Sequence, residues 1–440
     1  MSNYTISNDA LTQELQHIGS LIASAQLQQA AKALNDVQKR HGDDARIYLL
    51  GSRLAEQAGN APGALQAAER AQKAAPAWPV ATMELAMLLL RQGKQAQALE
   101  QARRGMALAP DDFDVTRRSV GIAIQANDLP ATVEWLRKAV ALRPNEQMLR
   151  SLLAAQLVAA KEGEEALALY DQLVQEQPWD TETLAGRAQA ALLLGKNEQA
   201  RQDAEALLRL EPGNASHQHL LALARGEQPK TQPEEKVKAL FDRFASTFDV
   251  TLWRNLEYRV PQQVAGILLQ AHPDRKFNLL DLGCGTGLVG ACLGRIDGFI
   301  IGVDLSEEMI RKAALHNVYE RFHNVNVLDA LRETPKDHYE AITCCDVLVY
   351  VGDLSEVVPN ALRILKPGGH FIFSCEAATE DEEDMVLRPT SRFAHKASAV
   401  QRLCEETGFE SVEIEHLPQL RTEGGQPLPG FLVTARKSQG

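Results

Sequence analysis

The 440-residue sequence predicts a multidomain chain, in which an all-α region of repeated helix pairs precedes an α/β domain with a parallel sheet. Three observations predict this division. Prolines recur on one period in the N-terminal half, the composition changes after a short polar segment near residue 230, and a glycine-rich turn follows an apolar run in the C-terminal half. The apolar content of 45% beside 24% charged residues is typical of globular domains with sizeable cores.

The N-terminal half is rich in Ala, Leu and Gln, which favours helices. Five prolines are spaced 34 residues apart, at Pro76, Pro110, Pro144, Pro178 and Pro212. Small residues keep the same 34-residue period, at Ala30, Ala64, Ala98, Thr132, Ala166 and Ala200. We expect two helices per unit, with a turn former such as Gly93 or Gly195 between them. The small residue lets the helices approach closely, and the proline ends the second helix because it has no N–H to donate.

This period and pattern resemble the tetratricopeptide repeat. Six units fit, at 11–44, 45–78, 79–112, 113–146, 147–180 and 181–214, and residues 215–225 read as a capping helix. The resemblance implies a superhelix whose concave face holds a protein or peptide. Alternatively, the repeats only support the second domain or form a dimer. The predicted organisation is therefore a repeat array over 11–225, a linker over 226–236 and a second domain over 237–440.

Past the linker, apolar runs alternate with amphipathic helices, as in α/β domains. The predicted strands are 277–282, 299–303, 325–328, 340–345, 370–375, 411–416 and 431–435. The predicted helices are 286–294, 306–320, 354–365 and 396–407. Parallel strands joined by helices place a ligand at the carboxyl ends of the strands.

The stretch FNLLDLGCGTGLVGACL, residues 277–293, indicates a nucleotide site at the end of the first of these strands. A dinucleotide site also has a glycine loop here, but Leu288 stands where its third glycine is needed. The glycines Gly283, Gly285 and Gly287 follow an acid, Asp281, which suits a cationic ligand better than a pyrophosphate. S-adenosylmethionine has an ammonium and a sulfonium group, and the glycines would let the backbone approach it closely.

Residues after the next two strands extend this prediction. Asp304 ends the second strand, where its carboxylate would accept both ribose hydroxyls, and Leu305 follows it. Met309 falls on the first turn of the next helix, where its thioether would pack on adenine, or it belongs to the core. Asp329 would accept from the adenine amino group with the backbone of Ala330 nearby, or it is a loop acid.

The whole series, over roughly 236–440, resembles a class I S-adenosylmethionine-dependent methyltransferase with a Rossmann-like fold. Joined to the repeats, it resembles a group of bacterial predicted tetratricopeptide-containing methyltransferases. The resemblance implies a transferase that uses S-adenosylmethionine but implies little about its substrate. Because repeats of this kind usually hold a protein or peptide, the first hypothesis for the acceptor is a protein or peptide recruited by the repeats. Two alternatives stay open: a small-molecule methyltransferase with repeats used for assembly, and a non-catalytic scaffold that binds the cofactor.

Further candidates surround this site. Phe241, Phe244 and Phe248 share one helix face, which in similar enzymes lies over the cofactor as a lid, or is simply core. Arg259 would pair with the cofactor carboxylate through a bidentate contact, or form a surface salt bridge.

Three residues are candidates for catalysis. Asp346 ends the fourth strand, near the expected methyl group, and Tyr350 lies one turn further on. Either would orient the nucleophile or take its proton, and the alternative for Asp346 is a bond within its loop. His395 is a candidate general base, although a lone histidine is more often structural.

Composition excludes several other classes. The net charge of −12 and the pI near 5.5 argue against nucleic-acid and acidic-membrane partners. The N-terminus lacks the pattern of a signal peptide, and we expect no membrane span and a cytoplasmic location. The six cysteines lack C-x-x-C spacing and the histidines lack partners at ligand spacing, so no metal site is predicted.

Overall fold

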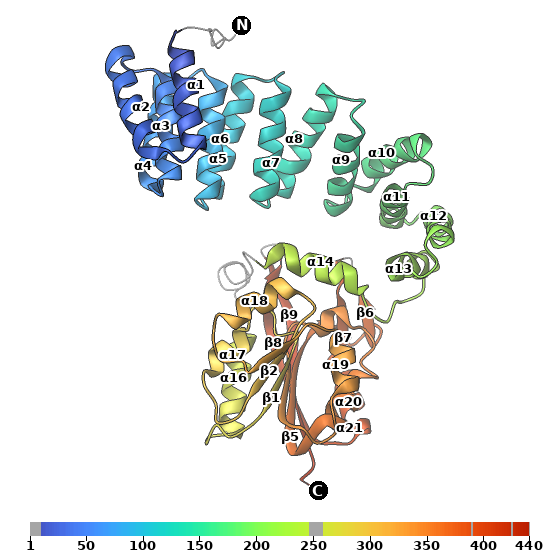
Figure 1. Ribbon diagram of the computed structural model, residues 1–440. Helices are drawn as coiled ribbons and strands as arrows, with labels where there is room; N and C mark the ends of the chain where they lie inside the picture. The colour runs from blue at the N-terminus through green and yellow to red at the C-terminus, as the bar shows by residue number, and fades with distance from the viewer. Residues whose placement is uncertain (1–9, 246–257, 389, 424–425, 440) are drawn as a thin grey trace. The chain divides into compact units, whose positions relative to one another are not determined.

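The computed structural model describes residues 10–245, 258–388, 390–423 and 426–439, and its chain divides into two compact units, Met1–Leu210 and Glu211–Gly440. The first unit is all helical, and the second contains, within these ranges, one nine-stranded sheet with helices on both faces (Figure 1). This confirms the predicted fold class. The helix α13, Ala215–Ala224, which the sequence marks as a cap of the repeats, groups with the second unit.

The first unit is built of helix pairs that follow one another along the chain. Their bounds are α1 Ala10–Ala23, α2 Leu27–His41, α3 Ala45–Gln57, α4 Ala61–Ala74, α5 Pro79–Arg91, α6 Gln95–Leu108, α7 Phe113–Gln125, α8 Leu129–Leu142, α9 Gln147–Ala159, α10 Gly163–Glu176, α11 Thr181–Leu193 and α12 Asn197–Leu210. Helix α4 ends at Ala74, two residues before Pro76, and the later second helices end at the same distance from their prolines. The six periodic small residues are each at most 2% exposed, because neighbouring helices pack directly on them.

The turn inside each pair requires a left-handed backbone. The φ angle is 74° at Gly93 and 67° at Gly195, the two glycines that the sequence indicates. Asn127 and Lys161 hold the equivalent positions with φ angles of 59° and 61°. Glycine adopts this conformation without strain, whereas a lysine does so at some energetic cost. The backbone conformation of this turn is therefore determined more strongly by the packing of the repeats than by the type of residue at its centre.

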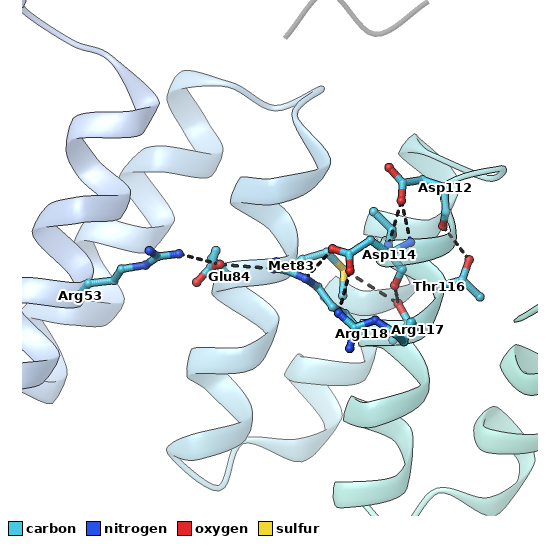
Figure 2. A network of polar contacts seen from close by, with 10 residues as sticks. Arg53, Met83, Glu84, Asp112, Asp114, Thr116, Arg117 and Arg118 are labelled. Carbon is cyan, nitrogen blue, oxygen red and sulfur yellow. Dashed lines mark hydrogen bonds and ion pairs between the residues drawn. The ribbon is translucent and has the colours of Figure 1, made fainter. Parts of the chain in front are cut away.

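Ion pairs connect successive repeats (Figure 2). Glu84 of α5 accepts from Arg53 of α3 at 3.0 Å and from Arg118 of α7 at 3.3 Å. Arg118 also pairs with Asp114 of its own helix at 2.9 Å. Exposed pairs of this kind contribute at most about 1 kcal/mol each, so they help to fix the register of the repeats while apolar packing supplies most of the stability.

The second unit is centred on a sheet with the strand order β3-β2-β1-β4-β5-β7-β6, and β9 pairs with both β5 and β8. Strands β3, β2, β1, β4, β5 and β7 run parallel to one another in this order, whereas β6 pairs antiparallel with β7, and β9 pairs antiparallel with β5 and β8. The strands are β1 Leu279–Leu282, β2 Ile300–Val303, β3 Arg321–His323, β4 Tyr339–Cys344, β5 Leu365–Ala378, β6 Met385–Leu387, β7 Phe393–Lys396, β8 Phe409–Glu423 and β9 Gln426–Lys437. The helices are α14 Glu234–Phe244, α16 Val260–Ala271, α17 Leu288–Leu293, α18 Glu307–Ala314, α19 Val327–Glu333, α20 Val357–Ile364 and α21 Ala397–Thr407, with a 3₁₀ turn, η2, at Leu348–Tyr350.

Two apolar layers cover this sheet. Leu279 of β1 packs with α16 and α17 on one face, while its neighbour Leu280 packs with α19, α20 and α21 on the other (Figure 1). Each central strand is therefore buried on both faces, which is why its sequence is a continuous apolar run. None of the described helices combines the length and apolarity that crossing a membrane requires.

The prediction of a strand over 325–328 is wrong. The third strand lies earlier, at Arg321–His323, and the run VNVLDA enters α19 instead. The side chain of Asn326 accepts from the N–H of Leu328 at 2.7 Å, which is an N-cap contact. The alternation of apolar residues in this run suggested a strand, but the cap decides in favour of a helix.

The polar segment 226–236 makes ordered contacts within the second unit. Thr231 forms an antiparallel bridge with Val351, and the N–H of Gln232 donates to the carbonyl of Tyr350 at 2.9 Å. Helix α14 then crosses the carboxyl ends of the strands, where Asp242 accepts from the Ser306 hydroxyl at 2.5 Å. This segment and α14 thus lie over the edge of the sheet at which a ligand is expected.

Candidate functional site

A cavity of about 250 Å³ lies at the carboxyl ends of β1, β2 and β4. Its walls include the glycine loop after β1, the residues after β2, one side of α19, the loop after β4 and residues of the segment Thr231–Phe241. Three arginines also line it, at Arg332, Arg392 and Arg421. Eight of the sequence-predicted site residues line it. Asp281, Gly283, Gly285, Asp304, Leu305 and Asp329 lie at one end, and Asp346 and Tyr350 lie at the other.

The three glycines of the loop have different tasks. Gly283 and Gly285 line the cavity with φ angles of 64° and 54°, and a Cβ on Gly283 would lie 2.1 Å from Cγ2 of Val347. Gly287, with φ at 82°, is the N-cap of α17, and its Cβ would lie 2.9 Å from Cβ of Ala313. The first two glycines therefore leave bare backbone facing the cavity, while the third lets α17 pack closely on α18.

Asp304 holds the end of β2 to the glycine loop. One carboxylate oxygen accepts from the N–H of Gly285 and the other from the N–H of Ser306, both at 2.8 Å. Burial raises the pKa of this carboxyl, and the two N–H donors oppose the shift. The helix cap is Ser306, whose hydroxyl accepts from Met309 N–H. Each oxygen of Asp304 keeps a lone pair for a ribose hydroxyl.

Asp281 is 1% exposed, on the central strand β1. Its two oxygens accept from the hydroxyls of Tyr319 and Thr343, each at 2.7 Å. Burial raises its pKa to about 6, while these two hydrogen bonds lower it. The carboxylate therefore meets hydroxyl donors and no cation within the described residues, so an ammonium group in the cavity would favour its ionised form.

The predicted adenine contacts divide into two groups. Leu305 and Asp329 line the cavity, the second with a side chain that is 53% exposed and paired with Arg332. Met309 is completely buried and Ala330 is 9% exposed, and neither is among the lining residues. Met309 therefore lies in the protein interior, which agrees with the alternative that it belongs to the core. Val327 and Leu328 provide the apolar wall of the cavity instead.

Arg259 likewise lies outside the cavity lining. Its side chain is exposed and borders a separate hollow formed with Gln263 and Leu420, so it does not reach the cavity. Arg421, at the end of β8, lines the cavity instead and is 1% exposed. Sequence reasoning missed Arg421, because no motif marks a single arginine 75 residues beyond the loop that it joins.

Of the three catalytic candidates, two lie in the cavity wall. Asp346 adopts a left-handed backbone with φ at 57°, and one of its oxygens bonds Arg421 at 2.5 Å. Burial raises the pKa of Tyr350, whose ring meets that of Phe241 edge to face at 5.5 Å. His395 is 3% exposed and lies outside the cavity, and its Nε2 bonds the carbonyl of Gly352 at 2.8 Å.

His395 therefore has a structural place. Burial lowers its pKa, which keeps the ring neutral in the interior. The related prediction of a lid face is confined to Phe241, because Phe248 and the side chain of Phe244 lie outside the described residues. Among the residues described, no group of three or more His, Cys, Asp and Glu side chains is arranged to hold a metal ion.

These residues fit S-adenosylmethionine. Gly283 and Gly285 present bare backbone to the cavity, and Asp304 offers acceptors to a ribose. The Asp281 carboxylate lacks a cationic partner within the described ranges and suits an ammonium group. A doubly covered parallel sheet with such a loop after its first strand, and an acid after its second, defines a nucleotide-binding domain of the methyltransferase class.

Comparison with known proteins agrees with this class. Residues 252–414 match a methyltransferase domain family, and residues 18–79 and 83–147 match a tetratricopeptide repeat family. The chain thus carries a tetratricopeptide array followed in the sequence by a methyltransferase domain, and the comparisons support S-adenosylmethionine as its cofactor.

Two curated relatives share the same name. The ubiquinone biosynthesis O-methyltransferase of Alkalilimnicola ehrlichii is 33% identical over 100 residues, which are 22% of this chain and 40% of that protein. The protein of that name from Bordetella avium is 26% identical over 181 residues, 36% of this chain and 75% of the relative. The chain spans about two fifths of the length of most such relatives.

A solved structure gives a similar match. The 1,6-didemethyltoxoflavin-N1-methyltransferase of Burkholderia thailandensis, with bound S-adenosylhomocysteine, is 19% identical. It matches 48% of this chain and 93% of its own with a TM-score of 0.35.

Proposed function

We propose that this protein is an S-adenosylmethionine-dependent methyltransferase whose acceptor is a protein or peptide recruited by the tetratricopeptide array. The observation that supports this most is the continuity of the cavity. Gly283 and Asp304 line one end of it and Asp346 and Tyr350 the other, so that a cofactor and an acceptor group would meet in one space.

The residues of the chain supply alignment. Asp304, tied to Gly285, would orient the ribose, and Asp281 would hold the ammonium group. Phe241 and Val237 of α14 line the cavity and would exclude water from it. Bound S-adenosylmethionine would supply an electrophilic methyl group for in-line displacement. Alignment of two reactants contributes about 7–11 kcal/mol to such a reaction, so a strongly basic residue is not required.

The repeats support a protein or peptide acceptor, because stacked helix pairs form an extended surface of the kind that holds other chains. A second candidate is a small-molecule acceptor. The relatives that match the C-terminal domain are named ubiquinone biosynthesis O-methyltransferases, and a cavity of about 250 Å³ accepts a small group as readily as a side chain.

The test is label transfer from S-adenosyl-L-[methyl-³H]methionine into a lysate that lacks the gene, with full-length protein. The matched control is Asp304→Asn, which keeps the shape of the side chain. Label in a protein band that the control fails to produce supports the proposal, and label in the small-molecule fraction supports the second candidate. No transfer by a protein that binds the cofactor would reject both in favour of a non-catalytic scaffold.

A further inference from the structure

A buried charge cluster lies behind the acceptor end of the cavity. Arg421 of β8 bonds Asp346 through Nη1 at 2.5 Å and Glu376 of β5 through Nη2. The Arg421 and Glu376 side chains are 2% and 3% exposed, whereas that of Asp346 is 23% exposed. One guanidinium therefore joins a fully buried carboxylate to one that borders the cavity.

The strand geometry places Arg421 in this position. The pairing of β8 with β9 shifts register between Leu417 and Arg421, and such irregularities re-aim side chains next to active sites. Leu420 packs in the apolar layer with α16, while the next residue, Arg421, turns to the cavity. Leu420 and Arg421 are each 1% exposed, so the end of this strand is buried on both of its faces.

Asp346 is held from two sides. Its backbone has the left-handed φ of 57°, and its N–H donates to the hydroxyl of Ser374 at 2.8 Å. Arg421 fixes Oδ1, and the other oxygen, Oδ2, has no hydrogen bond within the described residues. An uncommon backbone conformation that its surroundings fix in this way is typical of functional positions.

A second polar group faces the same end. Tyr258 lines the cavity and is 5% exposed, and its hydroxyl, close to Ser374, meets no partner with hydrogen-bond geometry in the described residues. A buried hydroxyl without a partner is unfavourable, and a polar atom of a ligand would satisfy it.

We infer that Arg421, backed by Glu376, is a positioning residue that aims Oδ2 of Asp346 at the methyl acceptor, whose nucleophile is an N–H or O–H group. This inference rests on the proposed methyl transfer. The lone pair of the nucleophile forms the new bond to the methyl carbon while the carbon–sulfur bond breaks and leaves its electron pair on sulfur. The proton that the nucleophile sheds passes by way of Oδ2 to water.

The test is a double-variant cycle in the full-length protein, with Arg421→Met, Asp346→Asn and both together. Methyl transfer is measured with tritiated S-adenosylmethionine and the lysate fraction that accepts label from the wild type. Calorimetry with S-adenosylhomocysteine reports the cofactor site. We expect kcat/KM to fall about 10²-fold in each single variant, as for a displaced reactive group, and no further in the double variant. The Kd of S-adenosylhomocysteine should stay within about threefold in all of them, because Arg421 bonds Asp346 and Glu376 at the acceptor end of the cavity.

Two more variants keep the test decisive. Arg421→Lys retains the charge and should recover part of kcat but not the full rate, since lysine cannot bridge both carboxylates. If Arg421→Met does not fold, the variant that combines Arg421→Met with Glu376→Gln takes its place in the cycle, because the second substitution removes the buried charge that the first leaves uncompensated. The control is Arg363→Met, which loses a half-buried arginine bonded to the carbonyls of Thr334 and Leu331, away from the cavity.

Three outcomes would overturn the inference. They are a folded Arg421 variant with wild-type kcat/KM, losses that multiply to about 10⁴-fold in the double variant, and an equal loss in Arg363→Met. Failure of the wild type to transfer label in any fraction would instead reject the proposed function.

Discussion

Replacement of Asp281 by asparagine should stabilise the free protein while weakening its cofactor site. Burial raises the pKa of Asp281 from 3.8 to about 6, so the interior disfavours its ionised form. The difference of about 2.2 pH units corresponds to about 3 kcal/mol at 1.36 kcal/mol per unit. Asparagine has nearly the same shape and no charge, so Asp281→Asn should gain about that amount at pH 7.

The pH dependence fixes the sign of this effect. The folded-state pKa lies above the unfolded value, so the folded protein binds the proton more tightly than the unfolded chain does. The folded form of the wild type therefore loses stability as pH rises from about 4 to about 6. The advantage of the variant should be about 3 kcal/mol at pH 7 and about half of that at pH 5, and it should vanish near pH 3.

Scanning calorimetry of the full-length protein measures this. The unfolding transition of the second unit is identified as the one whose midpoint temperature rises when S-adenosylhomocysteine is added to the wild type. A gain of about 3 kcal/mol in stability should raise this midpoint temperature by about 6–12 °C. Thr343→Val, which removes one hydroxyl donor to the carboxylate, is the matched control and should lower the transition. A variant that is less stable than the wild type at pH 7, or an advantage that does not shrink on acidification, would refute the argument.

Three further predictions concern single side chains. Gly283→Ala should destabilise the second unit by about 1–3 kcal/mol and weaken S-adenosylhomocysteine binding at least tenfold in calorimetry, because the new Cβ would overlap Val347. Arg259→Ala should leave that Kd within about twofold, since the side chain borders a separate hollow; a tenfold loss would restore it to the cofactor site. His395→Leu should lower the melting temperature through the lost bond to Gly352 but leave the kcat of the folded fraction unchanged, and a kcat loss at full folding would make the histidine catalytic.

The fold was predictable where one residue type has one structural consequence. A proline cannot continue a helix beyond its first turn, and each second helix from α4 to α12 ends two residues before one of the periodic prolines. The third strand was not predictable in this way, because VNVLDA satisfies the strand alternation and the helix cap together. The side chain of Asn326 settles that choice in favour of a helix, and its contact with Leu328 is visible only in the structure.

The site was predictable near the glycine loop and less so at the acceptor end. Asp281 lies on β1, and Gly283 and Asp304 directly follow β1 and β2, so the local sequence of two consecutive βα units places them together. Glu376 begins a run of six acids that ends at Asp384, a pattern typical of a solvated loop, but it is buried on β5 against Arg421. Since β8 is far from β4 and β5 in the sequence, only the tertiary pairing of β9 with β5 and β8 brings this cluster together.

The two ends of the cavity differ in how the negative charge of their acids is compensated. The acids at the acceptor end share a guanidinium, whereas Asp281 and Asp304 accept only from hydroxyl and N–H groups and form no salt bridge in the described part of the chain. A cationic ligand should need the ionised Asp281, and with its pKa at about 6 the ionised fraction falls about tenfold between pH 7 and pH 5.

The Kd of S-adenosylhomocysteine, which has an ammonium group, should rise by about that factor over this range in calorimetry. The matched ligand is 5′-methylthioadenosine, which lacks the ammonium group and should bind with a Kd that varies much less. A Kd for S-adenosylhomocysteine that is constant from pH 7 to pH 5, or an equal change for both ligands, would separate Asp281 from the ammonium group. The raised pKa would then reflect only the burial of an acid that ties β1 to Tyr319 and Thr343.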